Sequence, residues 1–541
     1  MRQTLTGALL AVLVQAAAAQ TPVPLYDNLG TLTHLISTRV PRAQRFFDQG
    51  LRLAYGFNHA EAIRAFREAA RLDSTCAICW WGVALAYGPN INAAMDSAAG
   101  VAAWEALQRA VALRAHASPT EQAYIDALAR RYGSNPTAER ARRDSAYAEA
   151  MGDVTRRHPN DLDAATLHAE ALMDLRPWNF WAPDGSAYPG VDDIVHSLEG
   201  VLRRNPYHPG ACHFYIHAVE ASPRPERALA CARRLAALMP GAGHLVHMPA
   251  HVYIRLGMYE EAARANVHAA HTDEAYIADQ RPDGVYPMAY YPHNLHFLWA
   301  AAAFEGRRAD ADDAIRRLRA AAPAELARQA PPMEVFVLPP LYHMAWFGEW
   351  DNVLREPKPP AELVATTGVW RYARGRAFAA TGRLDEARHE LDSLTAAHRD
   401  APSRIPEGAT IGLAPPATLL GIAENLLAGE IAARDRQWDQ AIARLREAVR
   451  LGDGLRYFEP ADWYYPPRLS LGAVLLEAGR PADAEAVYRE DQQRNRNSGW
   501  SLFGLAQALE AQGKSVAAAR VREQFRRAWA RSDVRLAASR F

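Results

Sequence analysis

The chain is dominated by one hydrophobic period, that of an α-helix. From residue 41 onward, apolar side chains, mostly Ala and Leu, recur three and four positions apart, which places them on one face of a helix. Gly, Pro and short polar turns interrupt this pattern after roughly 12–18 residues. The alternation of apolar and polar positions that is typical of a half-buried strand is nearly absent. We therefore predict an all-α protein made of many short helices.

Small and aromatic residues recur at fixed spacings within this helical pattern. Two helix pairs carry the same series of a Gly, an Ala and an aromatic residue: Gly50, Ala62 and Phe66, and Gly472, Ala484 and Tyr488. The series resembles the signature of tetratricopeptide repeats, in which the small residues let two helices approach and the aromatic ring fills the gap to the next repeat. The resemblance covers most of residues 42–530. It implies a tetratricopeptide (TPR)-type α-solenoid, a right-handed superhelix of antiparallel helix pairs, and no single activity.

The turn signals divide the chain into roughly nine or ten helix pairs. We expect a signal peptide, an N-terminal extension, N-terminal TPR-like repeats, central repeats and C-terminal repeats, which span residues 1–19, 20–41, 42–205, 206–356 and 357–541.

The first residues predict export from the cell. Arg2 supplies a positive charge, an apolar run follows, and three alanines lead to Gln20, which together are typical of a cleaved signal peptide. Cleavage is expected near Ala19–Gln20, and the mature chain is expected in the periplasm or outside the cell. No later stretch is apolar for long enough to span a bilayer. The formal net charge of +0 argues against broad electrostatic binding to nucleic acid, so a protein or peptide in the concave groove is the expected partner.

Four cysteines allow up to two disulfides in an oxidising compartment. Cys212 and Cys231 lie on consecutive predicted helices and form the most favourable pair. Cys76 and Cys79 lie three residues apart on one predicted helix. Three interpretations of the second pair stay open, and two buried thiols are favoured over a strained disulfide or a pair of soft metal ligands.

Histidines in three successive repeats share one register. His213 lies 34 residues before His247, and the next pair, four residues further on, has the same separation, which is one TPR period. His244 and His247 correspond to His293 and His296, which lie 49 residues later. The excess over one TPR period matches an insertion around Thr272–Pro287. The aligned positions are His213, His217 and Glu220, then His244, His247 and His251, and then His293 and His296.

The register predicts that these side chains meet. In TPR proteins the first helix of each pair lines the concave groove, and neighbouring helices pack about 8–10 Å apart. Neutral imidazole is a common ligand of zinc, copper and iron, often with a carboxylate. We therefore predict a His/Glu metal site in the groove, with zinc or copper as the favoured ion and Glu220 as a ligand or general base. A hydrogen-bonding groove for an acidic or peptide ligand and plain structural packing stay open as alternatives.

Other residues flank this register. Tyr290 and Tyr291 are expected to wall the groove. Glu459 and Arg468, in an aromatic and proline-rich segment, are candidate ligand contacts. Asn266, His268 and His271 follow the second group of histidines on the next helix and are candidates to orient the metal ligands, with ordinary surface positions as the alternative.

The segment Gly243–Pro249 is similar to one shared by a group of secreted bacterial TPR proteins, which implies the fold and export but no activity. Three functions fit the sequence: a binding scaffold, a metal-dependent enzyme of hydrolase type, and storage or delivery of copper or zinc. The first leaves the histidine register unexplained, and the second lacks a known catalytic motif. We favour an exported binding protein with a metal site in its groove.

Overall fold

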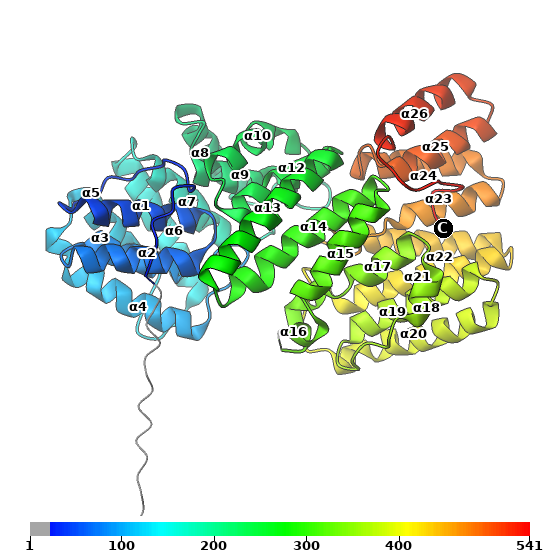
Figure 1. Ribbon diagram of the computed structural model, residues 1–541, viewed down its shortest axis with the longest axis horizontal. Helices are drawn as coiled ribbons and strands as arrows, with labels where there is room; N and C mark the ends of the chain where they lie inside the picture. The colour runs from blue at the N-terminus through cyan, green and yellow to red at the C-terminus, as the bar shows by residue number, and fades with distance from the viewer. Residues whose placement is uncertain (1–21, 330) are drawn as a thin grey trace, which may run out of the picture.

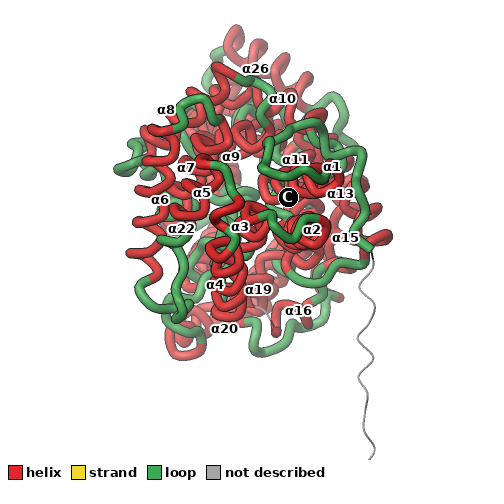
Figure 2. The backbone as a smooth tube through the Cα atoms, turned by 90° about the vertical axis from the view of Figure 1, so that its left-hand side faces the viewer, coloured by secondary structure: helices red, strands yellow, loops and turns green. Residues whose placement is uncertain are grey.

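In the computed structural model, which describes residues 22–329 and 331–541, the chain is built from α-helices joined by short turns (Figure 1). A view turned by 90° likewise shows helices joined by loops and turns (Figure 2). No strand forms within the described ranges, where β-type pairing is confined to three isolated bridges. The all-α prediction is therefore confirmed. The predicted signal peptide and its cleavage point lie outside the described residues.

Three successive groups of helices form the chain. The first group is α1 (Pro41–Tyr55), α2 (His59–Leu72), α3 (Ala77–Ala86), α4 (Ser97–Ala112), η1 (Arg114–His116), α5 (Pro119–Leu128), α6 (Arg140–Arg157), α7 (Leu162–Asp174) and α8 (Val191–Arg204). The second is α9 (Pro209–Glu220), η2 (Pro225–Ala228), α10 (Leu229–Leu238), α11 (Gly243–His247), α12 (Pro249–Arg255), α13 (Tyr259–Gln280), η3 (Tyr286–Tyr290), α14 (Tyr291–Phe304), α15 (Arg308–Ala321), α16 (Ala324–Gln329), η4 (Pro331–Phe336), α17 (Pro339–Trp346) and α18 (Trp350–Arg355). The third is α19 (Val364–Ala380), α20 (Leu384–Arg404), α21 (Pro416–Arg434), α22 (Trp438–Asp453), α23 (Pro467–Glu477), α24 (Pro481–Arg494), α25 (Gly499–Ala511) and α26 (Ser515–Ala528).

The predicted repeat packing is present at both ends of the array. The buried ring of Phe66 on α2 lies against Gly50 of its own repeat and Gly82 on α3 of the next, and a Cβ at either glycine would come within 2.6 Å and 2.5 Å of that ring. Tyr488 on α24 lies in the same way between Gly472 and Gly504. Consecutive helix pairs therefore stack through an aromatic side chain, and the chain is a TPR-type α-solenoid, as predicted.

Replacing Gly50 by Ala is expected to destabilise the protein by about 1–3 kcal/mol, because the new methyl group would overpack the fully buried Phe66 ring. The lower urea midpoint of unfolding measures this effect. Gly200→Ala on α8 is the matched control, since a Cβ there would meet only the tip of Arg203, at 3.6 Å, and alanine favours a helix over glycine. An equal loss of unfolding free energy in Gly50→Ala and Gly200→Ala would contradict the packing argument.

The central helices join two end lobes. In Figure 1 α1–α7 lie on one side, α17–α26 lie on the other, and α9–α15 run between them. The predicted boundaries after residues 205 and 356 fall between helices, and the division into separate units at these points stays a prediction. None of the helices in the described part of the chain combines the length and apolarity needed to cross a bilayer.

Both chain ends of the described structure fasten distant repeats together. Near the start, Gly241 N–H donates to the carbonyl oxygen of Asn28 at 2.8 Å, which holds the N-terminal extension against the central repeats. Near the end, the Asp533 carboxylate accepts from the N–H groups of Arg308 and Ala309 at 2.7 Å and 2.9 Å. This carboxylate caps the N-terminus of α15, where a negative charge is favoured.

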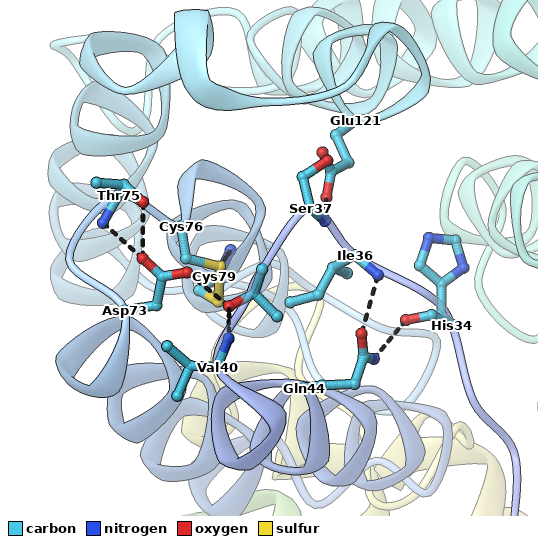
Figure 3. The surroundings of a disulfide bond; sticks show 11 residues. His34, Ile36, Ser37, Val40, Gln44, Asp73, Thr75, Cys76, Cys79 and Glu121 are labelled. Atoms are coloured by element: carbon cyan, nitrogen blue, oxygen red, sulfur yellow. Dashed lines mark hydrogen bonds between the residues drawn. A yellow bond between two sulfur atoms is a disulfide. The ribbon is translucent and has the colours of Figure 1, made fainter.

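The structure differs from the sequence prediction for both cysteine pairs. Cys76 and Cys79 form a disulfide (Figure 3), whereas Cys212 and Cys231 are buried free thiols whose sulfur atoms lie 2.7 Å apart. Cys76 is the N-cap of α3 and has an extended backbone rather than a helical one. Its sulfur atom therefore lies beside Cys79, whose N–H donates to it at 3.2 Å, as is usual for an N-cap side chain. The preferred interpretation of that pair as buried thiols was wrong.

Candidate metal centre

Six histidines from neighbouring first helices gather into two groups of three. Triad A is His213, His217 and His244, and triad B is His247, His251 and His293. Within each triad, one ring nitrogen of every histidine lies within 4.8 Å of the others. Such sets suit a transition-metal ion, which binds imidazole nitrogen at about 2.0–2.1 Å.

The local fold explains how the histidines divide. α9 presents two histidines one helical turn apart, both in triad A. The next first helix is broken where Pro249 begins α12, because proline has no N–H to donate to the preceding turn. α11, before the break, gives one histidine to each triad, while α12 and α14 complete triad B.

The two triads lie side by side in the protein interior. The ring centroids of His217 and His251 are 5.5 Å apart, and those of His244 and His247 are 5.8 Å apart. Five of the six histidines are almost completely buried, and His293 is half-buried. Ions bound by the two triads would therefore be close neighbours.

Four of these rings are held from behind by a hydrogen-bond acceptor at Nδ1. The acceptors are Tyr55 O for His213 (2.7 Å), Asn266 Oδ1 for His247 (2.6 Å), and the two oxygens of Glu220 for His217 (2.7 Å) and His251 (2.5 Å). A ring that donates from Nδ1 has a lone pair on Nε2 when it is neutral. Acceptors in this position orient metal-binding histidines and fix their tautomer.

His247 and His251 show the consequence most clearly. Asn266 Nδ2 donates to Ala262 O at 2.8 Å, which turns the amide oxygen toward His247. Both rings therefore carry hydrogen on Nδ1, and their Nε2 atoms face each other at 2.8 Å. Neutral rings in these tautomers offer two lone pairs and no donor between them. A metal ion or a proton between the two Nε2 atoms would satisfy both lone pairs.

Burial disfavours the charged form of most of these histidines. It lowers the pKa of five histidines, and the neighbouring imidazoles lower most of these further, since a charged ring in the protein interior loses its hydration. The five are His213, His217, His244, His247 and His293. A lowered pKa favours the neutral ring, which is the form that binds a metal ion.

Glu220 connects the two triads. It lies at the end of α9, completely buried, and also accepts from Tyr457 Oη at 3.0 Å. Burial alone would raise its pKa, but His251 and His217 outweigh that effect and hold the pKa well below the usual range. Both oxygens point at Nδ1 atoms, behind the rings. Glu220 thus holds one ring of each triad from behind, and its predicted roles as metal ligand or general base stay predictions.

The other predicted site residues divide between the site and its surroundings. Tyr290 lies with its ring centroid 4.7 Å from that of His244. His296 is outside both triads and stacks on Trp299, with ring centroids 5.6 Å apart. Two further candidates are held by local partners: Tyr291 Oη donates to Glu274 at 2.7 Å, and Arg468 forms a bidentate pair with Asp453 at 2.6 Å.

Two residues of the first repeat complete the surroundings of triad A. Tyr55 supplies a backbone carbonyl to His213, and the Phe57 ring centroid lies 4.5 Å from that of the same histidine. A backbone acceptor leaves no signal in the sequence, because every residue has one. Of the three candidates for orienting the ligands, the structure brings Asn266 to His247, whereas His268 and His271 are exposed.

A cavity of about 520 Å³ adjoins the triads. It lies where the N-terminal repeats, the central repeats and the segment before α23 meet, and His293 and Glu459 stand in its wall. Burial raises the pKa of Glu459 to about 7. Its apolar and aromatic lining residues include Ile91, Met95, Trp178, Tyr290, Met333, Val335, Phe336, Leu413 and Phe458, and the charged residues Arg140, Asp144 and Asp174 line it as well.

No protein-family model and no curated protein matches this chain. Among solved structures, it is similar to the human IFIT1 dimer with m7Gppp-AAAA, with 11% identity over 91% of each chain and a TM-score of 0.34. It is also similar to yeast Tom70 (10% identity, 89% of this chain and 92% of that one, TM-score 0.28) and to Naa15/Naa10 bound to HypK-THB (13%, 90% and 89%, 0.24). At these values the likenesses carry no argument about function.

Proposed function

We propose that this protein binds two transition-metal ions, one in each triad, and that the pair forms a reactive centre. The observation that carries the proposal is the opposed pair of Nε2 atoms of His247 and His251, 2.8 Å apart with both Nδ1 hydrogens committed elsewhere. Three protein ligands leave one position on each ion open, which is typical of catalytic rather than structural sites. An open position beside a cavity favours an enzyme over storage or delivery.

The ligand set favours copper over zinc. Neither triad includes a carboxylate or a thiolate, and among the described residues Glu220 is the one carboxylate hydrogen-bonded to their rings. Two Zn²⁺ ions would keep four positive charges beside that single negative charge, whereas a copper pair would carry four only while it is oxidised, as Cu²⁺, and two when it is reduced, as Cu⁺. Uncompensated buried charge is costly, and imidazole is a good ligand for copper. Zinc, which would suit a hydrolase, is the alternative ion. Elemental analysis of the purified protein distinguishes it from copper.

Metal content tests the proposal directly. We expect about two equivalents of copper in the wild-type chain, purified without a His tag, because each triad supplies the three ligands of one ion. His213→Ala is expected to retain about one equivalent, His247→Ala about one, and the double variant none. Elemental analysis together with the protein concentration gives these ratios.

His296→Ala is the control, since His296 belongs to the same sequence register but lies outside both triads. It should keep both ions. A wild-type protein that contains no transition metal and takes up none from solution would overturn the proposal. Loss of metal from His296→Ala equal to that from His247→Ala would overturn the assignment of ligands.

Partner binding and export from the cell are both compatible with this proposal. A solenoid of helix pairs presents an extended surface that suits a protein or peptide partner, and binding of such a partner remains a prediction from the fold. Export to the periplasm or beyond likewise rests on the pattern of residues 1–19. Copper and a disulfide between Cys76 and Cys79 both suit an oxidising compartment.

A further inference from the structure

The cavity beside triad B has walls suited to an aromatic molecule. Four rings reach it from separate parts of the solenoid: Trp178 after α7, Tyr290 before α14, Phe336 at the end of η4 and Phe458 before α23. Met95 and Met333 add polarisable sulfur atoms, which make favourable contacts with aromatic rings. A volume of about 520 Å³ is within the range of small-molecule sites.

The same walls touch both triads. His293 of triad B lines the cavity directly and is the one half-buried member of the six. On the side of triad A, the Trp178 ring centroid lies 5.2 Å from that of His217, and the Tyr290 centroid lies 4.7 Å from that of His244. A molecule in the cavity would therefore lie against the metal centre.

Several polar side chains also face this space, namely Asn90, Asn92, Arg140, Asp144, Asp174 and Glu459, and a carboxyl group there can hydrogen-bond a hydroxyl group. Glu459 presents a carboxyl group in the wall. Asn92 accepts from Trp178 Nε1 at 3.1 Å and donates to Tyr290 Oη at 3.5 Å, so its amide holds two of the aromatic rings in place. An apolar chamber with a few oriented polar groups is the usual form of a small-molecule site.

We propose that this cavity binds a phenolic substrate and that the paired copper ions oxidise it with dioxygen. The inference rests on the proposed function. One 1,2-diphenol loses two electrons and two protons to become a 1,2-quinone, and the electrons reduce two Cu²⁺ to two Cu⁺. Two such turnovers supply the four electrons and four protons that convert one dioxygen into two waters. Two adjacent one-electron acceptors match a substrate that gives up electrons in pairs.

Oxygen consumption with 4-methylcatechol as the probe tests this inference on the full chain loaded with copper. We expect uptake of one dioxygen per two diphenols oxidised. Met333→Trp and Ala94→Trp, which narrow the cavity from different walls, are expected to lower the rate at least about tenfold, as a ring that fills the pocket excludes the substrate, while copper content stays at two equivalents. Retained copper shows that these variants fold.

Met288→Trp is the matched control, because Met288 is exposed and does not line the cavity. It should oxidise the probe at the wild-type rate, and the His213→Ala/His247→Ala variant should give only the rate of copper-free solution. Copper-loaded protein that leaves dioxygen and diphenol unchanged would overturn this inference and leave two-metal binding standing. Wild-type rates in both cavity variants would overturn the assignment of the pocket, and a protein without copper would overturn the proposed function itself.

Discussion

Replacing Glu220 by Gln is expected to weaken metal binding in both triads at once. Glu220 gives one oxygen to His217 of triad A and the other to His251 of triad B. Glutamine keeps the size of the side chain but has one acceptor oxygen and an NH₂ group, so at least one of the two Nδ1–H groups would face a donor. That ring must flip or change tautomer, and its Nε2 lone pair then leaves the metal.

The expected size follows from other metal sites. Loss of a group that orients a metal ligand typically lowers affinity about 10–100-fold, and the loss of the buried negative charge adds to it in both triads. Competition with a chromophoric chelator measures each affinity. Glu334→Gln is the matched control, because Glu334 is also buried but accepts from Thr366, away from the triads. Tight binding of two ions by Glu220→Gln would show that Glu220 has no positioning role.

The fold could be predicted because its determinants are local and repeated. A glycine, an alanine and an aromatic residue at fixed spacing encode one contact, and Phe66 makes that contact with Gly50 and Gly82 as the pattern requires. The cysteine prediction failed for the opposite reason. Whether Cys76 belongs to a helix depends on where α3 begins, and its N-cap position reversed the preference between buried thiols and a disulfide.

The site could be predicted in outline only. A shared register of 34 residues brings histidines of successive first helices to one wall, and six of the seven aligned histidines enter the two triads. The division into two triads could not be read from the spacing, because it depends on the break at Pro249. Arg468 was a candidate ligand contact, but it pairs with Asp453, an acceptor whose proximity arises only in the folded chain.

Removal of the metal is expected to loosen the centre of the solenoid. The triads join α9, α11, α12 and α14, so the ions cross-link three successive repeats. An ion that binds only the folded state at about 100 times its dissociation constant stabilises it by about 2.7 kcal/mol, and two such ions by roughly 5 kcal/mol. The metal-free protein should therefore unfold at a lower temperature, and amide hydrogen exchange should accelerate first in these four helices.

The His213→Ala/His247→Ala variant separates this effect from nonspecific action of copper. It lacks one ligand in each triad, so its unfolding temperature and its exchange rates should be the same with and without copper. In the wild-type chain the protection from amide exchange that copper provides should be confined to the central repeats, because α1–α4 and α23–α26 contribute no ligand to either triad. Stabilisation of equal size in the double variant, or spread evenly over all repeats, would mean that copper acts elsewhere than at the paired triads.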